Sequence, residues 1–288
     1  MYPASNPRDI ISVPMINRRS LFQLISAAGL IFSPKAVCAA SDDVVLSNFH
    51  LYTKGAYAAW AGMWSLNIDP TMGLGHKAVE GQDFISSIVV RPDSFPRQSA
   101  MKWRVPDALA AKSGVYGYLH LAYGNYDHTP VERPIAPVRI SGLKQFTVNF
   151  DFQYVSGPSS GSVLLEFWLT SAPGNLDSKV FETGLFAHST PETIRYFKKT
   201  KLIGKYTDAL QREWLVHINN KMSPAFVMFL PTDEGNVVGA INWKDFLHYL
   251  VEKNILTGNE WLNGLALGVE PAKGAGEIVL KEFDVILN

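Results

Sequence analysis

The sequence predicts an all-β fold, a β-jelly-roll sandwich of two antiparallel sheets with one α-helix packed on the outer face. From Ser41 onward, short apolar segments alternate with Gly, Pro, Asn and Asp, which is typical of sandwiches and jelly rolls. Three segments, 145–154, 161–170 and 262–270, show the two-residue period of β-strands. The 288 residues are 47% hydrophobic, which is enough for one large core.

The remaining elements are predicted from two patterns: apolar residues at every second position indicate strands, and apolar residues at a spacing of three or four indicate helices. The expected strands, in chain order, are 44–51, 57–64, 84–90, 100–105, 117–123, 145–154, 161–170, 214–218, 225–229, 262–269 and 277–287. A helix is expected after the N-cap Asn242, with Asp245 in its first turn, and it should end before Gly258. A second candidate helix spans 190–199, followed by a lysine-rich, solvated loop edge.

The first forty residues are predicted to be an export signal, and residues 41–288 to be a single domain. Arg18 and Arg19 precede the apolar run 21–32, and small residues before Ser41 supply a cleavage site. The run is too short to span a membrane as a helix. The arginine pair resembles a twin-arginine signal, with a Sec signal as the alternative, and Met15 is a second candidate start. We therefore expect an exported protein, periplasmic or secreted.

Composition and motifs exclude several classes of function. The 26 basic and 26 acidic residues balance, which argues against a nucleic-acid partner or a polybasic membrane contact. The seven histidines lack metal-ligand spacing, and no Gly-x-Ser-x-Gly elbow or phosphate-binding loop is present. The single cysteine, Cys38, leaves with the signal, so the mature chain forms no disulfide. We expect no metal, no cofactor, no stable membrane insertion and a monomer.

Three of the expected strands each carry a single carboxylate on the face opposite their apolar face. In 262–270, one face is apolar and the other carries Gly, Ala and then Glu270. In 161–170, Glu166 shares its face with Trp168 among apolar neighbours, an environment that is unfavourable for an acid without a partner or a task. In 145–154, Asp151 lies on a wholly polar face opposite a row of aromatic residues. We expect these acids to line one concave surface.

Two carboxylates and aromatic side chains on one surface are what glycoside hydrolysis requires. One acid protonates the leaving oxygen, while the other attacks the sugar or activates water. Aromatic rings pack against the apolar C–H faces of sugars. The candidate substrate-binding residues are Trp60, Trp64, Tyr118, His120, Asn149 and Trp168.

The residues 267–276, Leu-Gly-Val-Glu-Pro-Ala-Lys-Gly-Ala-Gly, followed by an alternating strand, resemble the C-terminal signature of glycoside hydrolase family 12. The helix after Asn242, the Trp214 strand and the Trp168-Leu169 pair are also similar to that family, and the resemblance covers roughly residues 118–288. It implies an endo-acting, retaining β-1,4-glucanase or xyloglucanase. In that interpretation Glu270 is the acid/base, Glu166 the nucleophile and Asp151 its hydrogen-bond partner.

One departure from the family pattern concerns the nucleophile. The family has its acid four residues before the Trp, whereas Glu166 is two residues before Trp168, and an ungapped match places Leu164 at the nucleophile position. The family's N-terminal Asn-x-Trp-Gly stretch is not clearly present, and Trp60 or Trp64 takes its place. The alternatives are therefore a non-catalytic carbohydrate-binding jelly roll, or a structural periplasmic protein that shares the fold.

The export prediction can be checked directly. Cleavage after Ala39 or Ala40 gives a mature protein that begins at Ala40 or Ser41. N-terminal sequencing of the exported protein should find one of these residues first, and exported chains that retain Met15 would contradict the prediction.

Overall fold

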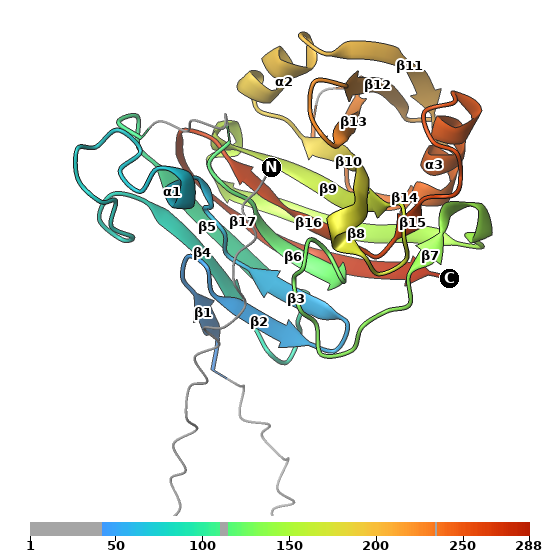
Figure 1. Cartoon of the computed structure of the whole chain (residues 1–288). Coiled ribbons are helices and arrows are strands. Elements are labelled where there is room, and N and C mark those ends of the chain that lie inside the picture. The colour runs from blue at the N-terminus through green and yellow to red at the C-terminus, as the bar shows by residue number, and fades with distance from the viewer. Residues whose placement is uncertain (1–41, 110–114, 234) are drawn as a thin grey trace, which may run out of the picture. The chain divides into compact units, whose positions relative to one another are not determined.

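The computed structural model describes residues 42–109, 115–233 and 235–288, and within them it forms two stacked β-sheets (Figure 1). The expected export signal, residues 1–40, lies outside the described residues. The smaller sheet contains, in spatial order, β1 (Val44–Leu46), β4 (Ile85–Val90), β5 (Ser99–Val105), β17 (Gly274–Leu287), β8 (Phe146–Ser156) and β14 (Gly239–Asn242).

The larger sheet contains most of the strands that lie in the C-terminal half of the chain. Its order is β11 (Lys201–Thr207), β12 (Glu213–Asn219), β13 (Ala225–Pro231), β10 (Lys179–His188), β9 (Gly161–Thr170), β16 (Gly264–Pro271), β6 (Leu119–Gly124), β3 (Tyr57–Trp60) and β2 (Leu51–Lys54). Two short strands, β7 (Val138–Arg139) and β15 (Trp261–Leu262), pair beside the end of β9. Neighbouring strands are antiparallel except β10 and β13, which are parallel.

The main core lies between the two sheets. Phe146, Val148 and Phe150 of β8 face it from the smaller sheet, and Leu165 and Phe167 of β9 face it from the larger one. The predicted alternation is therefore confirmed for both strands. A second cluster of buried apolar side chains covers the opposite face of the larger sheet, where Leu164, Phe186 and Met228 meet. Strand β9 is consequently buried on both of its faces.

Helix α3 (Trp243–Glu252) follows Asn242, as predicted, but it packs on a different surface from the expected outer face. Trp243 contacts Phe146, Phe167 and Phe229, with ring centroids 6.2, 4.8 and 5.9 Å away. All of these rings belong to the main core. The helix therefore continues the smaller sheet beyond its edge strand β14, because its apolar side covers core residues of β9 and β13 that the six strands leave uncovered.

The other helices are short. They are α1 (Ser65–Ile68) and α2 (Pro191–Phe197), with single 3₁₀ turns η1 (Ile140–Gly142), η2 (Pro158–Ser160) and η3 (Leu176–Ser178). Helix α2 matches the second candidate helix and is capped by the Thr190 side chain, which accepts from the Thr193 N–H. In the described part of the chain, no helix is long and apolar enough to cross a membrane.

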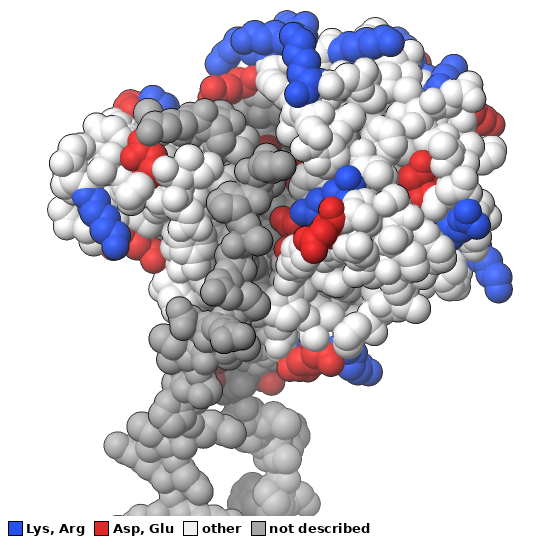
Figure 2. Space-filling model, in the orientation of Figure 1, with Lys and Arg blue, Asp and Glu red and all other residues white. Residues whose placement is uncertain are grey.

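Several strands differ from the sequence prediction, and the short strands β7 and β14 were not expected. The expected strand 44–51 is divided into β1 and β2, because Phe49 adopts a left-handed φ of 65° in the turn between them. Strand β10 was not predicted. Strand β11 was not predicted either, since the solvated loop edge was expected only for the lysine run at 198–201. It is an edge strand with exposed lysines, which is a common property of sheet edges. Figure 2 shows Lys and Arg side chains gathered over α2 and β11.

Candidate functional site

The candidate site lies on the face of the larger sheet that points away from the main core, which we call the outer face. On β9 this face carries Leu164, Glu166 and Trp168, and on β16 it carries Ala266, Gly268 and Glu270. Strand β6 adds His120 beside Gly268. A Cβ on Gly268 would lie 2.6 Å from the His120 Cβ, so glycine is required for this close approach of β16 and β6.

Glu166 is buried at the middle of the outer face and accepts a hydrogen bond from a tyrosine. Its side chain is 5% exposed, and the Tyr126 hydroxyl donates to its Oε1 at 2.5 Å. Burial raises the pKa of Glu166 to about 8, the Tyr126 hydrogen bond opposes this shift, and the nearby Glu270 adds to it. An acid with this pKa can hold or release a proton near neutral pH.

Glu270 lies near the end of β16 and is half-buried. Burial raises its pKa to about 7, so it too changes protonation near neutral pH. A small pocket beside it is lined by residues of α2, of the 115–116 segment and of the end of β16. Glu166 and Glu270 therefore lie on one face of the larger sheet, as predicted, and both have raised pKa values.

The strand register sets the spacing between these two acids. On β9, Ser162 lies opposite Glu270, and Glu166 lies opposite Ala266, an offset of four residues. At about 3.3 Å per residue, that is about 13 Å between the backbone positions along the strands. Leu164 lies between them, opposite Gly268 and only two residues from Glu270 in register. At the position where the family pattern places the nucleophile, this chain therefore has an apolar side chain.

A third buried acid, Glu182, was missed by the sequence analysis. It lies on β10, directly opposite Trp168 of β9, and is 7% exposed. Burial, and after it the charge of Glu166, raise its pKa well above the ordinary value. The signal was present in the sequence, since Glu182 and Gly184 repeat the pattern of a lone acid and small residues that identified β16.

The expectation that Asp151 lines the same surface is wrong, and so is the placement of Asn149 there. Both residues lie on β8, which belongs to the smaller sheet, and alternate with the core residues Phe150 and Phe152. Their side chains therefore point away from the core on the far side of the sandwich. In register, Asp151 lies opposite Glu282, and Asn149 lies opposite Asp284. Asp151 cannot hydrogen-bond Glu166 in this arrangement.

Tyr118 and His120 lie on the outer face as predicted, but both are buried and held by hydrogen bonds. Their rings stack with centroids 4.8 Å apart, and the Tyr118 hydroxyl donates to the Leu164 carbonyl at 3.0 Å. The His120 Nδ1 lies 3.2 Å from the Tyr118 carbonyl, which can only accept, so this nitrogen carries the proton. Burial lowers the pKa of His120 to about 4, which leaves the ring neutral with Nε2 as an acceptor.

The predicted tryptophans lie at different places around the acids. Trp60 is half-buried at the end of β3, with its ring 5.5 Å from His120. Trp64 is half-buried and packs against the outer-face cluster. Trp168 is 5% exposed, and the Lys179 ammonium lies 4.3 Å from the centre of its ring. One face of Trp168 is thus covered by a cation, which leaves Trp60 as the better placed stacking surface.

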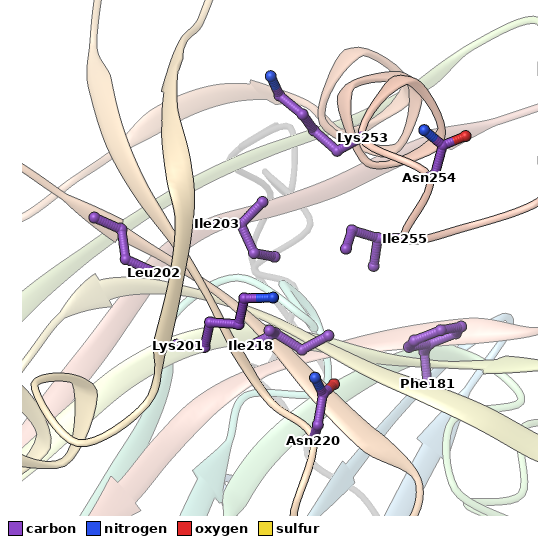
Figure 3. Close-up of a pocket in the computed structure, with 9 residues that line it drawn as sticks. All are labelled: Phe181, Lys201, Leu202, Ile203, Ile218, Asn220, Lys253, Asn254 and Ile255. Carbon is purple, nitrogen blue, oxygen red and sulfur yellow. The ribbon is translucent and has the colours of Figure 1, made fainter.

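A larger cavity lies elsewhere, between β11, β12 and the end of α3. Its volume is ≈ 410 Å³ and it is lined by Phe181, Lys201, Leu202, Ile203, Ile218, Asn220, Lys253, Asn254 and Ile255 (Figure 3). This lining contains no carboxylate. The described residues also contain no cluster of His, Cys, Asp and Glu suited to a metal ion. Among the described residues, the carboxyls with raised pKa values, Glu166, Glu182 and Glu270, all lie on the outer face.

Comparison with solved structures shows the fold. The catalytic domain of Humicola grisea Cel12A, solved with a soaked thio cellotetraose, is 13% identical, has a TM-score of 0.67, and matches 85% of this chain and 99% of its own. Trichoderma harzianum endoglucanase 3 from family GH12 has 14% identity, a TM-score of 0.66, and coverage of 87% and 100%. The family 12 xyloglucanase from Bacillus licheniformis has 16% identity, a TM-score of 0.64, and coverage of 85% and 100%.

These likenesses confirm the predicted β-jelly roll and the resemblance to family 12 at the level of the fold. No protein-family model matches the sequence, and no curated protein matches it either. The chain is therefore a divergent jelly roll of the kind that glycoside hydrolase family 12 uses.

The buried acids predict that stability falls with rising pH. Glu166 and Glu270 have folded-state pKa values of about 8 and about 7, above the ordinary 4.5, so the folded chain binds their protons more tightly than the unfolded chain does. The contribution of these two acids to stability is fully present below about pH 4.5 and falls by several kcal/mol as the pH rises to about 8, at about 1.4 kcal/mol per pKa unit.

Urea unfolding at several pH values checks this prediction. Replacing both acids (Glu166→Gln with Glu270→Gln) should flatten the decline, because the amides do not titrate. Asp151→Asn is the control and should keep it, since Asp151 lies on the far side of the sandwich. A wild-type curve that rises between pH 5 and pH 8 would contradict the burial of these carboxyls.

Proposed function

We propose that the protein binds β-linked glucan chains on its outer face and hydrolyses them with Glu270 and Glu166. The observation that carries this proposal is the placement of two acids with raised pKa values on one face of the larger sheet. The jelly-roll likeness to endoglucanases and a xyloglucanase supports the substrate class. Endo action on β-1,4-glucan or xyloglucan is the corresponding form of the proposal.

The register favours inversion of the anomeric centre over the retention that the family resemblance implies. Retaining enzymes hold their carboxyls about 5–5.5 Å apart, and inverting enzymes about 6.5–9.5 Å apart, with a water molecule between base and sugar. Side chains on neighbouring strands meet most readily at an offset of up to two residues. Glu166 and Glu270 are offset by four, about 13 Å along the strands, so their carboxyls reach the wider spacing only when both side chains extend toward each other, and the shorter spacing is less accessible still.

The surroundings of each acid distinguish their roles. Glu166 accepts the Tyr126 hydrogen bond and lies near the Lys179 ammonium, and both contacts favour its ionised form. These two contacts suit Glu166 to act as the base that takes a proton from water once it is ionised, although burial leaves its pKa, about 8, above that of Glu270. Glu270, whose pKa is raised by burial, is the acid that protonates the leaving oxygen. The acids are separated along the strands, so a sugar chain that passes between them runs across the strands.

The proposed roles require one acid protonated and the other ionised. The fraction of protein in that state is greatest between the two pKa values, whichever acid holds the proton. The value of kcat/KM should therefore peak at a pH between about 7 and about 8.

A second candidate function is a carbohydrate-binding protein without hydrolytic activity. Leu164, the apolar residue at the position of the family's nucleophile, favours it. Binding would use the same face, with Trp60 as the stacking surface. The two candidates differ in one observable property, the formation of new reducing ends.

The decisive variants are Glu270→Gln and Glu166→Gln, assayed on soluble β-glucan and xyloglucan for new reducing ends. Each should lower kcat by roughly 10²–10⁴-fold, the usual contribution of a general acid or base. Asp151→Asn is the matched control and should retain activity within about twofold, because its β8 position is remote from the outer face.

Two outcomes would contradict the proposal. If Glu166→Gln keeps wild-type activity, Glu166 is not the base. If the wild type binds glucan and releases no reducing ends, the protein is a carbohydrate-binding jelly roll, and Leu164 is the reason.

A further inference from the structure

Two residues that lie opposite each other on neighbouring strands of the outer face each have a buried polar atom without a hydrogen-bond partner among the described residues. These atoms are the indole Nε1 of Trp168 and the Oε2 of Glu182. The two residues are directly opposite each other across β9 and β10, where side chains are about 4.5–5.5 Å apart at Cβ. They are 5% and 7% exposed, respectively.

Leaving such atoms unpaired is costly. A buried donor or acceptor without a partner costs about 1–3 kcal/mol, and most buried polar groups in proteins are paired for that reason. A donor and an acceptor left unpaired in adjacent positions, next to a candidate catalytic acid, indicate a place where a ligand completes the hydrogen bonds.

We propose that Trp168 and Glu182 form a hydroxyl-binding pair that takes two neighbouring hydroxyl groups of the sugar bound beside Glu166. This inference rests on the proposed function, and it adds Glu182, a residue that the family resemblance does not supply, to the substrate-binding site.

The chemistry of the two side chains fits a sugar diol. The Trp168 N–H can only donate, so it pairs with a hydroxyl oxygen. Burial first, and then the charge of Glu166, raises the pKa of Glu182 well above the ordinary value, which favours its neutral carboxyl. A neutral carboxyl both donates and accepts, so it can bind a hydroxyl group without introducing a charge beside Glu166.

The contacts of Trp168 also indicate that the N–H edge of its ring, rather than the ring face, is the part that binds the sugar. The ammonium of Lys179 lies over the ring and is ion-paired with Asp127, which follows β6. A sugar ring cannot stack on that side while Lys179 is there. The N–H edge remains unpaired, and this changes the predicted role of Trp168 from a platform to a hydrogen-bond donor.

The position of Trp168 and Glu182 indicates that they bind the sugar unit at the bond that is cleaved. Glu182 lies opposite Trp168, two residues from Gly184, which is the partner of Glu166. Long side chains at such diagonal positions reach one another. Hydroxyl contacts beside the reacting carbon strengthen in the transition state of glycoside hydrolysis. We therefore expect Glu182 to affect catalysis as well as binding.

The test is isothermal titration with a β-1,4-linked glucose tetramer, in a Glu270→Gln background that prevents hydrolysis. Glu182→Gln, which can still donate and accept, should bind within about threefold of the parent. Glu182→Met, similar in size but apolar, should bind about tenfold more weakly, the equivalent of one hydrogen bond at about 1.4 kcal/mol. Trp168→Phe should weaken binding by a similar factor. Glu252→Met, on the exposed side of α3, is the matched control and should change nothing.

Each outcome is informative. If the parent does not bind the tetramer, the proposed function fails and this inference fails with it. If the parent binds and Glu182→Met binds equally well, the pair holds only a buried water, and the inference is overturned while the proposed function stands. If Glu182→Met does not fold by circular dichroism, Trp168→Phe decides, and an unchanged affinity in that variant overturns the inference.

Discussion

The pairing register of β9 with β16 is the constraint on which the candidate site depends. The backbone hydrogen bonds of this pair place Leu164, and not an acid, two residues from Glu270, and they place Glu166 at an offset of four. A shift of β9 by one residue would turn Glu166 into the core and the apolar core face of β9 outward, so the register cannot change without loss of the fold. The spacing of the two carboxyls is therefore set by the sheet rather than by flexible loops.

Burial of both faces of β9 has electrostatic consequences. Because Leu164, Phe186 and Met228 form a second apolar cluster on the outer face, the acids among them are poorly solvated. This accounts for the raised pKa values of Glu166, Glu182 and Glu270, and the hydrogen bond from Tyr126 moderates the first of them. Acids that are held protonated near neutral pH suit proton transfer, at a cost in stability at higher pH.

Sequence periodicity predicted the strands but not their sheets. Strand β9 was found at its observed bounds because its core face, Val163 to Leu169, is uniformly apolar. Strand β10 was missed because the polar Thr183 occupies its core side and Gly184 interrupts the pattern, so Glu182 was missed with it. Asp151 was assigned to the wrong surface because the core sides of both sheets have the same alternation. Only long-range pairing distinguishes the two sheets.

The anomeric form of the first product tests the central claim most directly. Proton NMR of a β-glucan digest, recorded before mutarotation, distinguishes new reducing ends in the α form from those in the β form. The four-residue offset between Glu166 and Glu270 predicts inversion, so the α anomer should appear first. Initial release of the β anomer would contradict this account and require a carboxylate closer to Glu270. The absence of any product would contradict hydrolysis altogether.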